Sequence, residues 1–96
     1  MRLDIQAKHI EVNQQLEEQI RTKVAKLEHF FENIVDAIVY LHEENDHKEV
    51  EIKLIVKDNT LFVKENGENF QAALDKAVDV MKKQLKKYKE KQVKNI

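Results

Sequence analysis

The 96-residue sequence has no cysteine, serine, proline or tryptophan, and its only glycine is Gly67. Without serine and cysteine, the commonest nucleophiles of covalent catalysis and all thiolate metal ligands are excluded. A single glycine is too few for a glycine-rich phosphate-binding loop. The four histidines, which are His9, His29, His42 and His47, are not spaced as metal ligands. We therefore expect no enzyme activity, no cofactor, no metal and no small-molecule substrate.

Long hydrophobic runs are also missing. No apolar segment approaches the ~18 residues of a membrane helix, and the N-terminus contains Asp4 and lacks the apolar core of a signal peptide. The chain is 42% hydrophobic and 36% charged, which is typical of a soluble folded domain. A chain of this size buries about 60–65% of its unfolded surface, enough for one core. We expect a single domain over residues 1–96, in the cytoplasm and without a membrane partner.

The charge is distributed unevenly along the chain. The net charge is only −1, yet residues 1–81 contain ten Lys and Arg against 17 Asp and Glu. Residues 82–96 contain seven lysines and one acid, Glu90. This asymmetry predicts an anionic partner that is bound through one end of the molecule. The acidic remainder limits indiscriminate attraction to polyanions.

The apolar pattern predicts the element order β-α-β-β-β-α. Alternating residues indicate four strands, over 2–7, 37–44, 49–57 and 61–65. Apolar residues at helical spacing indicate helices over 14–31 and 70–92, capped by Asn13 and Asn69. The polar segments between strands are predicted to be turns, over 44–48 and 58–60. Because each helix has one apolar stripe, we expect both on one face of a four-stranded mixed sheet, an α+β fold.

Within this sheet, we expect the first two strands to be parallel, joined by the helical crossover, and the others to form an antiparallel meander. Phe30 lies at the edge of the first helical stripe, and residues 92–96 are expected to fray. The residues predicted to face the core are Leu16, Ile20, Val24, Leu27, Phe31, Val50, Ile52, Leu54, Val56, Phe70, Leu74, Ala77, Val78, Met81, Leu85 and Tyr88.

The lysines of the second helix avoid its apolar stripe. One row contains Lys76, Lys83, Lys87, Lys91 and Lys94, and the other flank carries Lys82, Lys86 and Lys89. In the first helix Lys23 and Lys26 share a flank, so adjacent helices would form a basic groove. The helix macrodipole favours C-terminal lysines by about 0.3–1 kcal/mol each, which explains two or three of them. Seven lysines within thirteen residues repel one another, so the pattern favours a polyanion-binding surface over a merely solvated face.

Two segments give the chain a family resemblance. They are "KVAKLEHFFE" at 23–32 and "AALDKAVDVMKKQLKKYKEK" at 72–91. With the β-α-β-β-β-α order, the chain resembles the ribosome hibernation promoting factors and the related ribosome-associated inhibitor, from residue 3 to residue 91. The resemblance implies a translation inhibitor that binds ribosomal RNA of the small ribosomal subunit in the messenger and transfer RNA channel. Such proteins stop translation in starved or stationary cells.

The resemblance also implies RNA-binding positions. Lys23 and Lys26 match the basic pair of the first motif, and the second motif has polar matches at Asp75 and Gln84. Two positions depart from the family: Lys83 stands where arginine is common, which weakens a bidentate contact, and Val80 stands where lysine is common. Basic positions of the second motif are matched by Lys83, Lys87, Lys89 and Lys91, while Lys82 and Lys86 add charge at positions that are not always basic. Together with Lys76, the residues expected to bind ribosomal RNA are Lys23, Lys26, Lys76, Lys82, Lys83, Lys86, Lys87, Lys89 and Lys91.

Longer members of the family carry a second, dimerising domain, whereas this sequence ends at Ile96. We therefore expect a short hibernation factor that is monomeric away from the ribosome. The alternative is a general structured-RNA-binding protein or RNA chaperone, which would bind bare RNA as well as ribosomes. Four aromatic residues are candidates for base stacking, although their positions favour core roles, and they are Tyr40, Phe62, Phe70 and Tyr88.

Overall fold

The computed structural model of the chain describes the backbone of residues 1–94 and the side chains of residues 1–91. Its elements are β1 (Arg2–Ala7), α1 (Gln14–Ala25), the 3-10 helix η1 (Lys26–His29), β2 (Ile34–Glu44), β3 (His47–Val56), β4 (Asn59–Gly67) and α2 (Phe70–Lys94). The predicted order and α+β class are confirmed. Residues 92–96 were expected to fray. The backbone of α2 is described as far as Lys94, while residues 95–96 and the side chains of 92–94 lie outside the described part.

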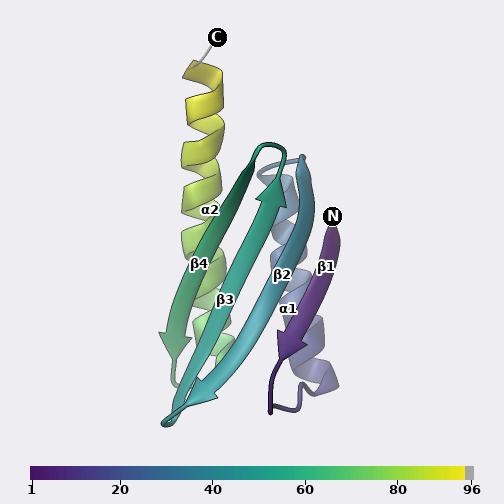
Figure 1. Cartoon of the computed structure of the whole chain (residues 1–96), viewed down its shortest axis with the longest axis vertical. Helices are drawn as coiled ribbons and strands as arrows, with labels where there is room; N and C mark the ends of the chain where they lie inside the picture. The colour runs from purple at the N-terminus through teal and green to yellow at the C-terminus, as the bar shows by residue number, and fades with distance from the viewer. Residues whose placement is uncertain (95–96) are drawn as a thin grey trace.

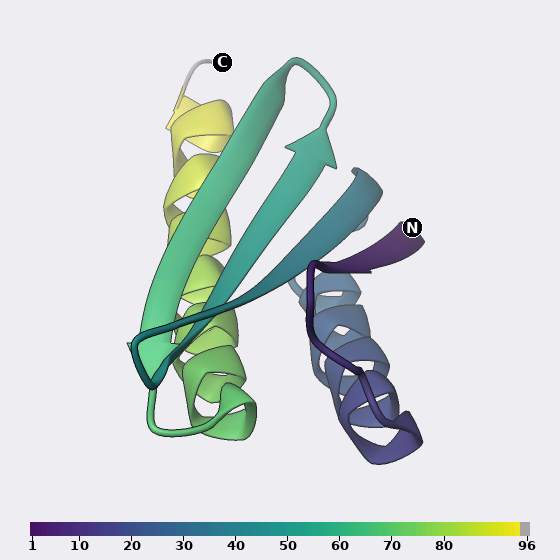
Figure 2. The same ribbon diagram turned by 60° about the horizontal axis from the view of Figure 1, so that its bottom comes forward.

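The four strands form one mixed sheet in the order β1-β2-β3-β4. β1 pairs with β2 in parallel, while β2–β3 and β3–β4 are antiparallel. Figures 1 and 2 show α1 and α2 side by side on the same face of this sheet, α1 beneath β1 and β2 and α2 beneath β3 and β4. The predicted topology and layering are therefore confirmed.

The turns between the antiparallel strands are tighter than predicted. Asn45 and Asp46 have φ angles of 50° and 66°, as expected of a two-residue hairpin turn whose strands twist correctly. At the β3–β4 turn, Asp58 has a φ of 70°, a backbone conformation that Asp and Asn tolerate better than most residues. Pairing with β3 draws polar flanking residues into the ladder, so β4 extends beyond its predicted ends to Asn59 and Gly67.

The end of the first helix differs from the prediction. Asn13 caps α1 as expected, its side chain accepting a hydrogen bond of 2.8 Å from the Leu16 N–H. The α-helix stops at Ala25, however, and the chain continues as the tighter turn of η1. The N–H groups of Phe30 and Phe31 both donate to the Leu27 carbonyl, at 3.1 and 3.2 Å. The extension of the helix to Phe31 was therefore wrong, because the last carbonyls are satisfied by this tighter turn.

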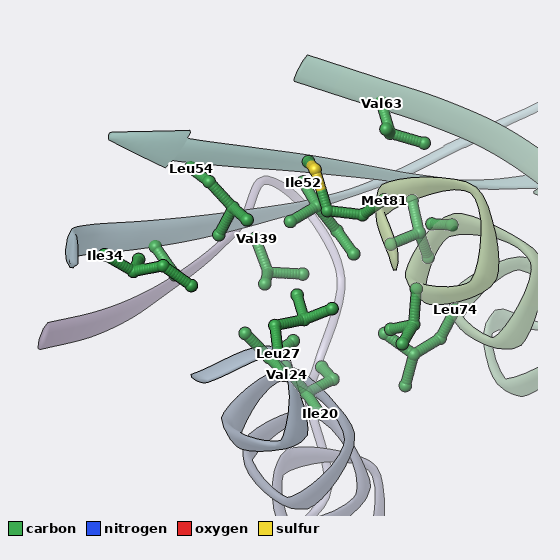
Figure 3. Packing of buried hydrophobic residues seen from close by; sticks show 14 of the residues in the cluster. Ile20, Val24, Leu27, Ile34, Val39, Ile52, Leu54, Val63, Leu74 and Met81 are labelled. Carbon is green, nitrogen blue, oxygen red and sulfur yellow. The ribbon is translucent and has the colours of Figure 1, made fainter. Parts of the chain in front are cut away.

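The core lies between the sheet and the two helices. Figure 3 shows Ile20 and Val24 of α1 and Leu27 of η1 pointing toward the sheet, beside Leu74 and Met81 of α2. The residues predicted to face the core from helical spacing and from the alternation of β3 are all buried except Phe70 and Tyr88, which are partly buried and pack against the cluster. The helical and alternating apolar patterns are therefore confirmed as core patterns.

The other face of the sheet carries no helix, and it exposes an aromatic ring. Phe62 was expected in the core, but it is 50% exposed. Its partner in the ladder is Lys53, whose neighbours Ile52 and Leu54 point toward the helices. Because successive residues of a strand alternate between faces, Phe62 must face outward. Tyr40 lies on this face too, since its neighbours along β2 are buried.

Gly67 lies where β4 meets α2. A Cβ added there would lie 2.7 Å from the backbone nitrogen of Ala73 and 3.1 Å from the Asn69 carbonyl oxygen. No real side chain tolerates such an approach to rigid backbone. Asn69 uses this close junction to cap α2, accepting a 2.8 Å hydrogen bond from the Ala72 N–H. Because Gly67 has no side chain, β4 can end close to the first turn of α2, and Asn69 can cap that helix two residues later.

Leu85 tests the packing of the second half of α2. Its side chain is completely buried, so Leu85→Ala should lower the free energy of unfolding by about 2–5 kcal/mol through lost burial and the cavity left behind. Urea denaturation measures this change. The matched control is Lys86→Ala, an exposed neighbour, which should change the free energy by less than about 0.5 kcal/mol. Equal midpoints for the two variants would contradict the described packing.

Candidate nucleic-acid interface

A groove of about 460 Å³ separates the first helical segment from α2. Val24 and Leu27 anchor one wall to the core, which turns their neighbours Lys23 and Lys26 outward. Val78 and its neighbours anchor the other wall. The residues that line the groove are Lys23, Lys26, Asp75, Lys76, Val78, Asp79 and Lys82. The predicted juxtaposition of the first-helix lysines with a lysine of the second is therefore present.

The groove also contains carboxylates, which the lysine pattern did not predict. The Lys23 ammonium forms an ion pair with Asp75 across the groove. Asp79 lies 3.8 Å from the Lys83 ammonium, one turn further along the same helix. A phosphate that binds Lys23 must compete with the Asp75 carboxylate. A wheel drawn for one helix cannot show this, because the pairing joins residues 52 positions apart.

The other groove lysines are held by different partners. The Lys76 ammonium donates to the Asn66 carbonyl oxygen at 3.3 Å. The Lys82 ammonium lies 5.5 Å from the centre of the Phe30 ring. Among the residues that the structure describes, no carboxylate is within ion-pair distance of Lys26, Lys82, Lys86, Lys87, Lys89 or Lys91. In the described part of the chain these ammonium groups therefore form no ion pair, although Asp79 lines the groove with Lys82 and Glu90 lies between Lys89 and Lys91 in the sequence.

The end of α2 projects beyond the sheet, as Figure 1 shows. The Tyr88 hydroxyl donates to the Lys57 carbonyl oxygen at 3.1 Å, so the helix is still supported by the β3–β4 turn at that level. Beyond it, Lys89 and Lys91 lie on a part of the helix that has left the sheet. The molecule is elongated as a result, with extents of 46 × 22 × 18 Å.

The nine predicted lysines therefore do not share one groove. Four of them line it, namely Lys23, Lys26, Lys76 and Lys82. Lys86 follows Lys82 by one helical turn and continues that flank toward the projecting end. Gln84 donates to the Phe62 carbonyl oxygen of β4 at 3.5 Å, so this side of α2 faces away from α1. Of the row predicted from the sequence, Lys83, Lys87 and Lys91 are exposed and do not line the groove, whereas Lys76 lines it. The side chain of Lys94, the fifth member of that row, lies outside the described part.

Comparison with known proteins gives the family. The family model described as "Sigma 54 modulation protein / S30EA ribosomal protein" matches residues 3–93. The ribosome hibernation promoting factor of Pseudomonas putida is 33% identical over 92 residues, which cover 96% of this chain and 90% of the relative. The factor of the same name from Escherichia coli is 31% identical over 91 residues, covering 95% and 96%. This chain belongs to that family. The resemblance carried by the two helical motifs is confirmed.

A solved structure has this fold at low sequence identity. The structure of a ribosomal subunit interface protein from Coxiella burnetii superposes with a TM-score of 0.89, over 94% of this chain and 99% of that one. The two are only 17% identical, so this likeness shows the fold alone.

The described residues offer neither a metal-ligand cluster nor a helix that could span a membrane. Across residues 1–91 no group of three or more His, Asp or Glu side chains is arranged to hold a metal ion. None of the described helices is both long and apolar enough to cross a membrane.

The Asp75 carboxylate should weaken the binding of polyanions at Lys23. Asp75→Asn removes the negative charge while keeping the shape, so we expect binding to a protein-free RNA hairpin to tighten by about two- to fivefold. Fluorescence anisotropy at fixed salt measures the dissociation constant. Asp46→Asn makes the same change of net charge at the β2–β3 turn, which does not line the groove and where Asn suits the backbone, and it should have a smaller effect. Weaker binding by Asp75→Asn would mean that the ion pair instead orients Lys23 for RNA.

Proposed function

We propose that this protein inhibits translation by binding the small ribosomal subunit in the channel used by messenger and transfer RNA. The observation that carries the proposal is the lysine groove between the helices, which continues along a helix that projects from the body. Relatives of this chain are named ribosome hibernation promoting factors, and a protein of the same fold is named a ribosomal subunit interface protein. These names support a ribosomal partner.

The lysines suit a phosphate-rich partner. An ammonium group binds phosphate mainly by charge and by release of condensed counterions, with little sequence information. Recognition of folded RNA then depends on shape and on 2′-hydroxyl contacts. Here the lysines sit on helices fixed by a common core, so their spacing is rigid. An elongated body with its excess positive charge at one end fits a channel walled by RNA.

Nine lysines form the proposed contact surface for ribosomal RNA, and they are Lys23, Lys26, Lys76, Lys82, Lys83, Lys86, Lys87, Lys89 and Lys91. Inhibition follows from occupancy, because a protein in the channel excludes messenger and transfer RNA. This mode of action needs no catalysis, metal, cofactor, small-molecule substrate or membrane. The protein then acts as one ribosome-binding domain over residues 1–96, monomeric in the cytoplasm until it meets a ribosome.

Co-sedimentation with purified small subunits tests this function. We expect binding that falls steeply as salt rises and that survives an excess of protein-free ribosomal RNA as competitor. Salt-sensitive binding that is lost equally to bare RNA would instead identify a general RNA-binding protein. A flat salt response would rule out an interface dominated by phosphate contacts.

Lys26, which lines the groove, and Lys86, which continues its flank along α2, test where the phosphates bind. Lys26→Gln combined with Lys86→Gln should reduce the slope of log K against log salt by about 1.4–1.8 and weaken binding to small subunits. The matched control removes two lysines elsewhere, Lys8→Gln with Lys53→Gln, after β1 and on the open sheet face. Both double variants lose the same net charge. Equal loss of binding would show that total charge, and not the groove, determines affinity.

A further inference from the structure

Phe30 is an exposed aromatic side chain at the end of the lysine groove. Within the described residues, the large apolar side chains that are exposed are Phe30, Val35 and Phe62, at 46%, 56% and 50%. Val35 is the extra residue of a β-bulge between Ile34 and Asp36, which explains its outward position. Phe62 lies on the opposite, open face of the sheet. Phe30 alone among them adjoins the lysine surface.

We propose that the Phe30 ring stacks on an unpaired base of ribosomal RNA. This inference rests on the proposed function, and it adds a contact that the lysines cannot make. Phosphate contacts position a nucleic acid, whereas an aromatic ring binds the face of a base. Stacking tolerates any base, so the ligand class is an unpaired nucleotide whose phosphates lie on the neighbouring lysines.

The core does not need the Phe30 ring. The adjacent Phe31 fills the core position, with 7% exposure and an edge-to-face contact with Tyr88 at 5.4 Å between ring centres. Tyr88 is in turn held by its hydrogen bond to the Lys57 carbonyl. Leaving the second ring of this pair half in water loses the stabilisation that burial would give. A ligand that covers the ring recovers that stabilisation.

The backbone that carries the ring is also fixed before any ligand arrives. The Phe30 N–H donates to the Leu27 carbonyl at 3.1 Å, and Leu27 is completely buried. Anchored on both sides, by Leu27 and by Phe31, the backbone of Phe30 has little freedom to lose on binding. A preorganised aromatic residue therefore binds with a smaller entropic cost than a ring on a mobile loop.

Lys82 connects the ring to the groove. Its ammonium lies 5.5 Å from the ring centre, within the range of a cation–π contact, and the same residue lines the groove. Lys26 begins the 3-10 turn after which Phe30 follows. The ring thus lies beside Lys82 of the groove, and Lys26 stands four residues before it in the chain. A base on the ring and phosphates on Lys26 and Lys82 are compatible with one nucleotide strand running across this junction.

Phe30→Ala tests the stacking contact in the full chain with purified small subunits. The loss of one stacked base corresponds to about 5- to 150-fold weaker binding. Because stacking releases no counterion, the slope of log K against log salt should stay unchanged. Phe30→Trp should retain binding, and Phe30→Leu should lose it while keeping an apolar side chain. The Leu and Trp variants also keep the test valid if Phe30→Ala fails to fold, which melting curves detect.

Phe62→Ala is the matched control, since Phe62 is equally exposed but lies on the other face of the sheet. It should bind as the unaltered protein does. Two results overturn the inference: Phe30 variants that bind as Phe62→Ala does, or a Phe30→Ala salt slope reduced by about 0.7–0.9, as the loss of one lysine–phosphate contact would reduce it. The second result would mean that the ring only positions Lys82. If the unaltered protein does not bind small subunits, the proposed function fails and this inference fails with it.

Discussion

The shared apolar core beneath the sheet is the interaction on which the lysine surface depends. α1 and α2 bury one stripe each against the same sheet face, so they must lie side by side. Their lysines flank those stripes, and the packing therefore sets the distance between the two lysine rows. This arrangement is held by Ile20 and Val24 of α1, Leu27 of η1, and Leu74 and Met81 of α2. A surface built on a core in this way keeps its spacing when it meets a rigid partner.

The charges on this surface are balanced rather than simply positive. Asp75 pairs with Lys23 inside the groove, and Asp79, which also lines the groove, lies near Lys83. Beyond Lys83 the described lysines of α2 form no ion pair, and Glu90 is the one acid among them. The positive charge is therefore partly compensated in the groove and least compensated along the helix end. Such a gradient favours contact with a partner that is rich in phosphate at several points and disfavours adhesion to any isolated phosphate.

The adjacent residues Phe30 and Phe31 have identical side chains but different surroundings, one exposed and one buried. Phe31 completes the core against Tyr88, and the ring before it, Phe30, is left at the surface near Lys82. Successive side chains point in different directions, so only one of the two rings faces the core. The preceding turn, η1, begins at Lys26, which lines the groove. This short stretch therefore carries both a groove lysine and a candidate stacking residue.

Much of this protein was determined by the sequence itself. Alternation in β3 and helical spacing in α1 and α2 predicted the core, and Asn13 and Asn69 predicted both helix starts, because these signals depend on neighbours within a few residues. The two helical motifs also predicted the family. Only the tertiary structure decided the Lys23–Asp75 pair, the outward position of Phe62 and the exposure of Phe30. Each of these depends on strand register or on packing between distant segments, for which local periodicity carries no information.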